Sequence, residues 1–496
     1  MKQHVALTLL VLEVLILQQG LALVRAPRVA IIGGGIGGAS ASHFLTELSN
    51  GTVDIDLYEA KTIGGRLATT KIDKDEFEAG GSIIHPKNKY MQRFVKLLGL
   101  EKSPYIAEDG ADAIWNGDEF IFLGDDLMSK MKLFWRYGLQ IFSLKNHVDN
   151  IMEDFVKIYD LQDAGHSFDN ATALISATNK DFPKLLRTST KDYFLRLGFK
   201  KILIDELVQA TTVVNYGQEV QNIQSFVGCI SVAGAGADLW SVKGGNKEVP
   251  QHLINRNKNV NVVPSRVTKI RNLANVSNSS QYEVTYINRG STDPITSNYD
   301  IVIIATPLTS DQEFQIEFVG FPNSLVFPGD FQTTYATFVK ANLNVTYFDL
   351  QQAMNSILSC NPNKTRISSV GKLNPVDGSV KKAPRVWKIF SRESMESSVI
   401  HKMFSQVIEK KEIVWKAYPH YSTNLKPNNF KLHDALYHVN AMEWIGSAME
   451  MSAIAGRNVA ILAYKDFQES CVHDFMSDRE AFQHSNIKKL RMREGL

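Results

Sequence analysis

Residues 28–38, RVAIIGGGIGG, decide the fold of this 496-residue chain. Their apolar start predicts a short buried strand, and the small residues that follow, 39–48, predict a helix. In such a loop Gly33 permits the tight turn, Gly35 lets the backbone approach a pyrophosphate, and Gly38 lets the helix pack against the strand. Strand, glycine loop and helix in this order predict a dinucleotide-binding unit with the diphosphate at the helix N-terminus.

A carboxylate follows this unit at a distance that suits a ribose contact. Residues 54–58, DIDLY, predict a second strand, and Glu59 comes directly after it, 21 residues beyond Gly38. In dinucleotide-binding folds an acidic residue in this place hydrogen-bonds a ribose hydroxyl and repels a 2′-phosphate. We therefore expect Glu59 to bind the ribose of a nucleotide that lacks a 2′-phosphate.

The next segment narrows the nucleotide to a flavin. It contains the loop IGGRL, with Gly65 and Arg66, and then the turn EAGGS, with Gly81 and Ser82. A guanidinium can hold a phosphate with two hydrogen bonds, and glycines let the backbone approach a flat ring. This segment resembles the FAD-containing amine oxidase superfamily. The resemblance implies FAD, with Arg66 beside its diphosphate and the Gly81–Ser82 turn close to the isoalloxazine ring.

Two later segments resemble the same superfamily. VNVVPSRVTKI at 260–270 alternates as a strand, and the resemblance implies that the Val267 backbone contacts the adenine. YDIVIIATP at 299–307 predicts a buried strand that resembles the one returning to the nucleotide, and it ends in a small-residue turn with Ala305. Because 240 residues separate Ala305 from Gly65, the cofactor domain must be assembled from discontinuous pieces.

A third piece lies in the carboxyl-terminal third of the chain. After LYHVNA at 436–441, a small-residue stretch begins a predicted helix that runs to about Tyr464. Its first residues, Ser447, Ala448 and Met449, would direct N–H groups at the flavin pyrimidine edge or the ribityl chain. The alternative is an amphipathic core helix without a ligand.

The fold that these pieces predict is α/β. We expect an FAD-binding Rossmann-type domain assembled from residues 28–85, 235–308 and 430–468. A mixed α+β substrate domain with a helical insertion would comprise residues 86–234 and 309–429, followed by a C-terminal tail, residues 469–496.

The insertion is expected to be largely helical from residue 86 to 230, and it contains an aromatic-rich run between Met128 and Tyr159. Apolar residues in this run recur mostly at three-to-four spacing, which is typical of amphipathic helices. Three explanations stay open: core packing, a wall for a long apolar ligand, or a face that rests on a membrane. The residues concerned include Met131, Phe134, Trp135, Ile141, Phe142, Val148, Ile151, Met152, Phe155 and Tyr159.

Charge and composition exclude several classes of protein. With 44% hydrophobic residues the chain can bury a large core, and a net charge of +2 lacks the strong positive field of a nucleic-acid binder. Cys229, Cys360 and Cys471 are isolated, which excludes a disulfide scaffold, a CxxC pair and a cysteine-rich zinc site. The sequence shows no clustered metal ligands, nucleophile elbow or Walker loop. We therefore expect no metal, and redox chemistry carried by the flavin.

The amino terminus is typical of a secretory signal peptide, residues 1–22. Its apolar run, Val5 to Leu17, is too short to cross a bilayer, and Gly20 and Ala22 provide the small residues that precede cleavage. A membrane anchor or a buried helix is the alternative. Six N-x-S/T sequons support a glycoprotein of the secretory route: Asn50, Asn170, Asn275, Asn278, Asn344 and Asn363.

Further strings resemble the prenylcysteine oxidase family. VNYGQ at 214–218, WSVKGGNK at 240–247 and AYPHY at 417–421 are specific to it in this order. The resemblance implies a lysosomal FAD thioether oxidase that takes farnesyl- or geranylgeranyl-cysteine from degraded prenylated proteins. Its products would be free cysteine, an isoprenoid aldehyde and, from molecular oxygen, hydrogen peroxide. We expect non-covalent FAD, and peripheral contact with the membrane that holds the lipid.

Lys388, in VWKIFS, is the first candidate for the catalytic site, because related amine oxidases place a lysine beside flavin N5. Three others are placed by their motifs to contact the flavin or the cysteine head: His85, Tyr418 and His420. Cys229 and His438 are further pocket candidates. No residue is assigned as a base.

Two other functions stay open at this point. A flavin amine oxidase or desaturase would share the cofactor site and act on a different substrate. A prenyl carrier such as the Rab GDP-dissociation inhibitors would share the fold, but that class lacks a secretory signal and does not use its glycine loop for flavin. A peroxide assay with farnesylcysteine and with simple amines separates these functions.

Overall fold

The structure is a computed structural model that describes residues 26–104, 112–124, 127–235, 237–273, 281–425 and 429–494. Of residues 473–494 it describes the backbone alone. The predicted signal peptide and the sequons at Asn275 and Asn278 lie outside the described residues.

A six-stranded sheet forms the centre of the nucleotide-binding half. Five strands run parallel, and β20 pairs antiparallel with β21 at one edge. Its strands come from regions far apart in the sequence, which confirms the predicted Rossmann-type fold built from discontinuous segments. In sheet order they are β20 (Lys431–His433), β21 (Leu436–His438), β13 (Ile301–Ile304), β1 (Arg28–Ile32), β2 (Asp54–Tyr58) and β9 (Val260–Val263).

Alternate residues of β1 show how both faces of this sheet are covered. Val29 and Ile31 join the apolar cluster on the helical face, whereas Ala30 and Ile32 join a second cluster on the other face. The helices on the first face are α2 (Ile36–Leu48), α3 (Lys89–Leu98), α13 (Glu248–Arg256) and α16 (Met449–Glu494).

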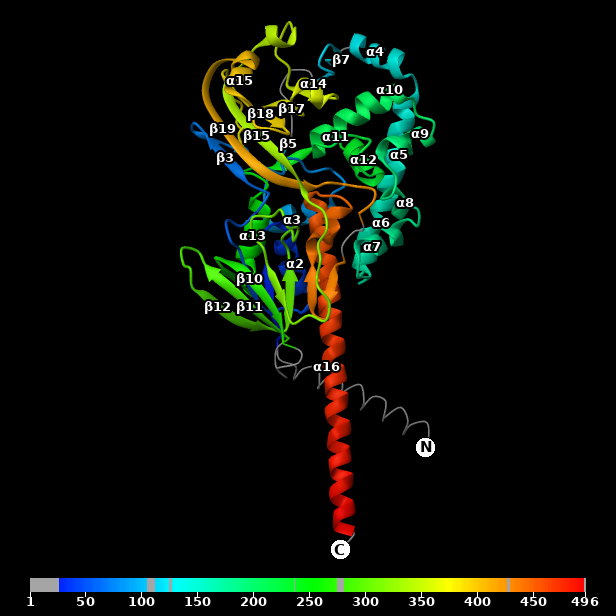
Figure 1. Cartoon of the computed structure of the whole chain (residues 1–496), viewed down its shortest axis with the longest axis vertical. Helices are drawn as coiled ribbons and strands as arrows, with labels where there is room; N and C mark the ends of the chain where they lie inside the picture. The colour runs from blue at the N-terminus through cyan, green and yellow to red at the C-terminus, as the bar shows by residue number, and fades with distance from the viewer. Residues whose placement is uncertain are drawn as a thin grey trace.

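The second face packs against a four-stranded sheet, seen at the lower left of Figure 1. The expectation of one continuous strand over 260–270 is wrong. The chain forms β9 and then β10, which belong to different sheets, and the break falls at Pro264 because proline has no N–H for a ladder. In sheet order the strands are β12 (Pro294–Tyr299), β11 (Tyr282–Asn288), β10 (Ser265–Asn272) and β14 (Glu317–Val319).

A seven-stranded sheet forms the centre of the substrate half. Two of its strands, β6 and β7, lie within the region expected to be largely helical, so that expectation is wrong for residues 112–115 and 120–123, and for the short strand at 102–104. In sheet order the strands are β19 (Phe404–Pro419), β15 (Phe331–Leu343), β18 (Arg385–Ser391), β17 (Ser369–Leu373), β16 (Ser356–Ser359), β6 (Asp112–Trp115) and β7 (Phe120–Leu123). Short pairs are β3 (Thr69–Ile72) with β4 (Asp75–Glu78), and β5 (Lys102–Pro104) with β8 (Trp240–Val242).

The insertion becomes helical at Leu127, as predicted, but its aromatic run divides into two parts. Val148, Ile151 and Phe155 are buried in the core, whereas Trp135 and Phe142 are exposed, so core packing explains only the second part. The elements are α4 (Leu127–Tyr137), α5 (Gln140–Phe155), α6 (Lys157–Asp163), α7 (Ala171–Thr178), α8 (Phe182–Leu185), α9 (Thr190–Arg196), α10 (Lys201–Leu203), η1 (Ile204–Val208), α11 (Gln209–Tyr216) and α12 (Ser225–Ala233).

The last helix continues past its predicted end at Tyr464. α16 reaches Glu494, and its distal part projects from the body of the molecule in Figure 1. Within the part of the chain that the structure describes, no helix combines the length and the apolar character needed to cross a bilayer. The remaining short helices are η2 (Val345–Phe348), α14 (Pro362–Thr365), α15 (Ser397–Met403) and η3 (Val439–Trp444).

Candidate functional site

In the glycine loop after β1, neighbouring atoms leave no room for a side chain at Gly33 or Gly38, whereas there is space beside Gly35. Gly33 has a φ of +110°, and a Cβ there would lie 2.6 Å from the Ala305 carbonyl oxygen. A Cβ on Gly38 would lie 2.0 Å from the Gly33 carbonyl oxygen. At Gly35, by contrast, a Cβ would meet only the Gly64 oxygen, at 3.7 Å, among the described atoms. The space beside Gly35 therefore suits a diphosphate held by backbone N–H groups.

Glu59 fixes this loop and stays accessible. One carboxylate oxygen accepts a 2.8 Å hydrogen bond from Gly34 N, and the other accepts one of 2.7 Å from Lys61 N. The side chain is half-buried, and each oxygen can accept a second hydrogen bond. The predicted ribose contact is compatible with this geometry.

Arg66 projects from the second glycine loop and is held by two residues far from it in the sequence. Its NH1 group donates a 2.8 Å hydrogen bond to the Ala417 carbonyl, and NH2 pairs with the buried Glu443 carboxylate. Burial opposes the charge on Arg66, but Glu443 outweighs it and raises the pKa of the guanidinium. About a third of the side chain is exposed, and a guanidinium has five N–H donors, so donors are left for a phosphate.

The EAGGS turn meets both the Arg66 loop and the start of α16. Gly81 N donates a 3.1 Å hydrogen bond to the Arg66 carbonyl, and a Cβ on Gly81 would lie 3.8 Å from Met449 Cγ. Ser447 and Met449 are half-buried and Ala448 is exposed, so the first residues of α16 border the same open space. The residues present therefore fit a dinucleotide whose second end reaches the EAGGS turn.

Val267 lies on the face of the six-stranded sheet opposite the helices. Its side chain packs with Ile32 and Tyr58 of the six-stranded sheet, and its backbone pairs with Tyr286. The ladder is irregular directly after Val267. The adenine contact stays a prediction.

The structure places Lys388 of β18 at the EAGGS turn. Its buried ammonium donates hydrogen bonds of 2.9 Å to Ser82 Oγ and 3.2 Å to the Glu78 carbonyl. Burial lowers the pKa of Lys388 and raises the pKa of the Glu78 carboxyl, and each group's charge opposes the shift of the other. The Lys388 amine therefore loses its proton more readily than an ordinary lysine.

Glu78 was missed by reasoning from the sequence. One of its carboxylate oxygens accepts a 2.7 Å hydrogen bond from Asn246 N, and the other has no partner among the described residues. The available indication was an acidic residue at the end of a short strand, separated by one residue from the two glycines.

An aromatic cluster joins the VNYGQ and AYPHY segments. The Tyr216 ring lies 5.0 Å from that of Tyr418 and 5.4 Å from that of Tyr421, both edge to face. Gln218 holds the segments together, since it donates a 2.9 Å hydrogen bond to the Pro419 carbonyl and accepts one of 3.0 Å from Tyr421 N. The contacts of Tyr216 and Tyr421 were not predicted from the sequence, although their motifs were recognised.

This cluster contacts the nucleotide half at the start of α16. Tyr421 Oη accepts a 2.9 Å hydrogen bond from Ser447 N at the start of α16. Trp415 of the same β19 strand donates a 3.1 Å hydrogen bond to the Ala79 carbonyl beside the EAGGS turn. The two motifs therefore form a wall next to the predicted flavin site.

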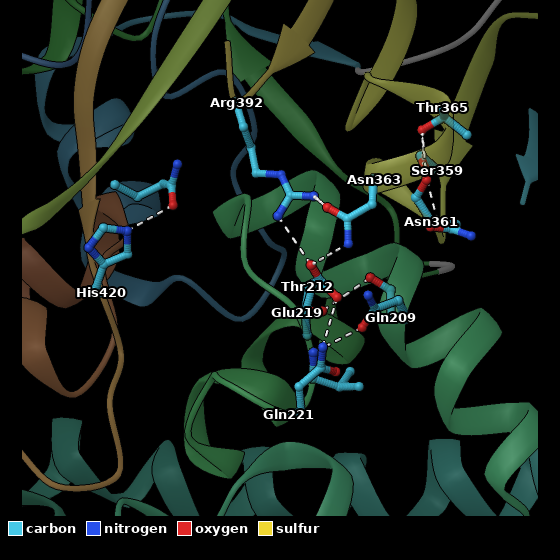
Figure 2. A network of polar contacts seen from close by, with 12 residues as sticks. Gln209, Thr212, Glu219, Gln221, Ser359, Asn361, Asn363, Thr365, Arg392 and His420 are labelled. Carbon is cyan, nitrogen blue, oxygen red and sulfur yellow. Dashed lines mark hydrogen bonds and ion pairs between the residues drawn. The ribbon is translucent and has the colours of Figure 1, made fainter. Parts of the chain in front are cut away.

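His420 lines a cavity of about 480 Å³ that Gln218 and Tyr421 of the same cluster also border. Its ring nitrogens lie 2.9 Å from Asp330 Oδ1 and 2.9 Å from Gln332 Oε1. Across the cavity Arg392 pairs with Glu219 at 3.1 Å, as Figure 2 shows. The cavity thus combines a cation, a carboxylate and a histidine.

The other candidates are placed elsewhere. His85 accepts a 3.0 Å hydrogen bond from Lys87 N in the turn before α3, and no described contact links it to Lys388. His438 is buried beneath the glycine loop and donates a 3.3 Å hydrogen bond to the Thr306 carbonyl. Cys229 is buried in α12, and burial raises the pKa of its thiol to about 12. Their catalytic roles stay predictions without a supporting contact.

The described sequons differ in how their amides are used. Asn50 is exposed in the turn after α2, and Asn170 caps α7 through its side-chain oxygen. The Nδ2 groups of Asn344 and Asn363, where a glycan would attach, donate to the Lys402 carbonyl at 2.8 Å and to Glu219 at 3.4 Å. Asn50 is therefore the most accessible of the four.

Solved structures with a similar fold include amine oxidases. Putrescine oxidase, as a double mutant from a structure-based redesign of cofactor binding, has a TM-score of 0.56 at 13% identity and covers 88% of this chain and 99% of its own. Cyclohexylamine oxidase from Brevibacterium oxydans IH-35A has a TM-score of 0.56 at 14% identity, covering 89% and 100%. These likenesses show the fold.

Sequence comparison is more specific. Residues 31–98 match an NAD(P)-binding Rossmann-like domain, and residues 124–474 match prenylcysteine lyase. Prenylcysteine oxidase 1 of Bos taurus is 36% identical over 459 residues, 89% of either chain, and that of Homo sapiens is 36% identical over 461 residues, 89% of this chain and 90% of its own. Prenylcysteine oxidase 1-like of Bos taurus is 34% identical and covers 93% of this chain and 95% of its own. This chain therefore belongs to the prenylcysteine lyase family.

Proposed function

We propose that this oxidoreductase is an FAD-dependent oxidase that cleaves the thioether of farnesyl- or geranylgeranyl-cysteine. Its relatives named prenylcysteine oxidase 1 support this substrate. The observation that carries the proposal is the contact between Tyr421 and Ser447, because it brings the family-specific AYPHY segment to the start of α16. The predicted flavin site and a substrate wall then meet at one place.

The reaction oxidises the carbon between the sulfur and the alkene of the prenyl group. FAD, when bound, supplies a two-electron acceptor for the hydride that leaves this carbon. Water adds to the resulting cation, and the hemithioacetal collapses to free cysteine and an isoprenoid aldehyde. Molecular oxygen takes up the two electrons and leaves as hydrogen peroxide, so the enzyme acts on a sulfur group with oxygen as acceptor.

Some residues of this chain bind the cofactor, and another positions a proton or a water molecule. Arg66 binds the diphosphate and Glu59 the ribose, while the open side of Gly35 lets the backbone approach. Lys388 holds a water or a proton near the EAGGS turn, because its amine lies against Ser82 and titrates more readily than an ordinary lysine. FAD is held without a covalent bond in this proposal, because no cysteine or histidine has a sequence spacing that ties it to the flavin ring.

The cysteine head of the substrate is zwitterionic and needs both charges matched. The cavity beside His420 offers Arg392 for the carboxylate and Glu219 for the ammonium group. The remaining binding comes from the prenyl chain, at roughly 0.8 kcal/mol per buried CH₂.

We also propose how the protein meets this lipid. The predicted signal peptide and sequons favour a glycoprotein that reaches the lysosome by the secretory pathway, where prenylated proteins are degraded. There the lipid is collected by peripheral contact with a membrane.

A peroxide assay tests the function. Purified protein should be yellow, release FAD on denaturation, and form peroxide with farnesylcysteine at a far lower KM than with S-allylcysteine. Arg392→Gln should raise the KM for farnesylcysteine but not for S-farnesylcysteamine, which lacks the carboxylate. Preference for a farnesyl amine over the thioether would instead establish an amine oxidase, and colourless protein that takes up no FAD would exclude both enzymes.

A further inference from the structure

Helix α4 holds two polar side chains against the protein and leaves most of its large apolar side chains exposed. Arg136 Nε and Tyr137 Oη donate hydrogen bonds of 2.7 and 2.6 Å to the Glu206 carboxylate of η1, which fixes one side of the helix. On the other sides Trp135 is 81% exposed and Leu127 is 76% exposed. A surface helix of a globular protein normally turns its apolar side inward. This helix is therefore built to present apolar residues outward.

The same apolar surface continues into α5. Gln140 donates a 3.1 Å hydrogen bond to the Gly198 carbonyl and accepts one of 2.8 Å from Lys200 N, so the α4–α5 corner lies against the turn between α9 and α10. Leu197 in that turn is exposed as well. We name this surface the α4–α5 face, defined by the exposed residues Leu127, Met128, Phe134, Trp135, Leu139 and Phe142.

The charged side chains within the two segments that form the α4–α5 face are positive. Three of them pair with acids that flank the segments: Arg136 with Glu206, Lys145 with Asp149 and Lys201 with Asp205. Residues 127–148 and 193–204 contain lysines and arginines but no aspartate or glutamate. Among them Lys132, Arg196 and Lys200 are exposed. Tryptophan, phenylalanine and leucine beside cations form the composition that binds the headgroup region of an anionic bilayer, where rings enter the interface and cations meet phosphates.

We propose that the α4–α5 face docks on an anionic lipid bilayer. In Figure 1 α4 lies at the end of the molecule opposite the projecting part of α16, with α9 and α10 beside it, so this end can approach a flat surface. This inference rests on the proposed function, because an enzyme that acts on prenylcysteine has a reason to contact a membrane. The contact itself rests on the apolar residues and the charges, and does not depend on flavin chemistry.

Sedimentation with vesicles tests the docking. The mature protein should bind vesicles of phosphatidylcholine with phosphatidylserine, and bind those of phosphatidylcholine alone more weakly. Rising salt should weaken the first binding, because it screens the cations. Trp135→Ser with Phe142→Ser should reduce binding by about tenfold or more, and Lys132→Glu with Lys200→Glu should abolish the preference for anionic lipid.

A matched control removes apolar surface elsewhere. Val326→Ser with Val380→Ser deletes two exposed apolar side chains outside the α4–α5 face and should leave binding unchanged. FAD content and the melting temperature should be the same in all variants, so a failure to dock is distinguishable from a failure of the oxidase. The proposal is overturned if wild-type protein binds neither vesicle, if the Trp135 and Phe142 variant binds as well as wild type, or if the face instead holds a dimer that this variant dissociates.

Discussion

Lys388 Nζ lies 2.9 Å from Ser82 Oγ, although 306 residues separate the two in the sequence. The contact joins β18 of the substrate half to the EAGGS turn of the nucleotide half. Ser82 Oγ in turn donates a 2.8 Å hydrogen bond to the Gly80 carbonyl, so the ammonium is oriented by groups that the backbone holds. Lys388 is therefore one of the residues through which the substrate half reaches the predicted flavin site.

Lys388→Met should slow flavin reduction or reoxidation by about tenfold or more while FAD stays bound, because a positioned proton is lost and the diphosphate contacts are not. Stopped-flow absorbance, anaerobic and then aerated, separates the two half-reactions. Lys410→Met is the control: this lysine also donates to a carbonyl, that of Met395 at 3.0 Å, but lies on β19 away from the turn. Equal rates in Lys388→Met and wild type would remove Lys388 from the site.

A glycine-to-alanine substitution should have different effects at two positions of the glycine loop. Gly38→Ala should destabilise the fold by at least about 2 kcal/mol, because its Cβ would lie 2.0 Å from the Gly33 carbonyl oxygen. Gly35→Ala should fold normally, since its Cβ would have space, but should lose FAD because the methyl group occupies the approach to the loop. Thermal unfolding and flavin content measure both effects. A Gly35→Ala variant with full flavin content would contradict the placement of the diphosphate.

Arg66→Ala should lower both FAD affinity and the stability of the apoprotein, the latter by about 1–3 kcal/mol, because Glu443 is left buried without its cation. Adding Glu443→Gln should restore about 1 kcal/mol or more of stability, since the amide carries no charge, without restoring FAD affinity. Thermal unfolding of apoprotein and FAD titration measure the two separately. If the second substitution restores nothing, the ion pair is not the source of the loss.

Acid should destabilise the protein through His438. Burial lowers its pKa to about 4, whereas an unfolded histidine titrates near its ordinary value, 6.5. As pH falls below 6.5 the unfolded chain binds a proton that the folded chain does not, so the stabilisation present above this pH is lost, by about 2 kcal/mol at pH 5.

His438→Gln removes this titration and keeps a donor for the Thr306 carbonyl. The stability difference between wild type and variant, from denaturant unfolding at several pH values, should therefore shift against wild type between pH 6.5 and 4. A difference that is constant with pH would show that His438 titrates normally. His43, which is also buried with a pKa lowered to about 4, is present in both proteins and cancels.

Local sequence patterns were sufficient to predict the first two strands and the glycine loop of the nucleotide half. The predicted strands at Arg28–Ile32 and Asp54–Tyr58 have these bounds in the structure, and the glycine loop and Glu59 lie together after them. Each depends on residues near in sequence: an apolar run of strand length, glycines where backbones approach closely, and a carboxylate at the strand end. The missing N–H of Pro264 could also have predicted the break between β9 and β10, although the alternating pattern suggested one continuous strand.

What the sequence by itself determined is therefore the Rossmann-type unit, the discontinuous cofactor domain and the resemblance to an oxidase family. Tertiary structure alone decided that Lys388 meets Ser82, that Arg66 pairs with Glu443, and that Trp135 faces solvent. The reason is physical. Periodicity tells which residues share a face of a helix, but whether that face is covered, and which distant side chain completes a buried charge, depends on the elements that pack beside it.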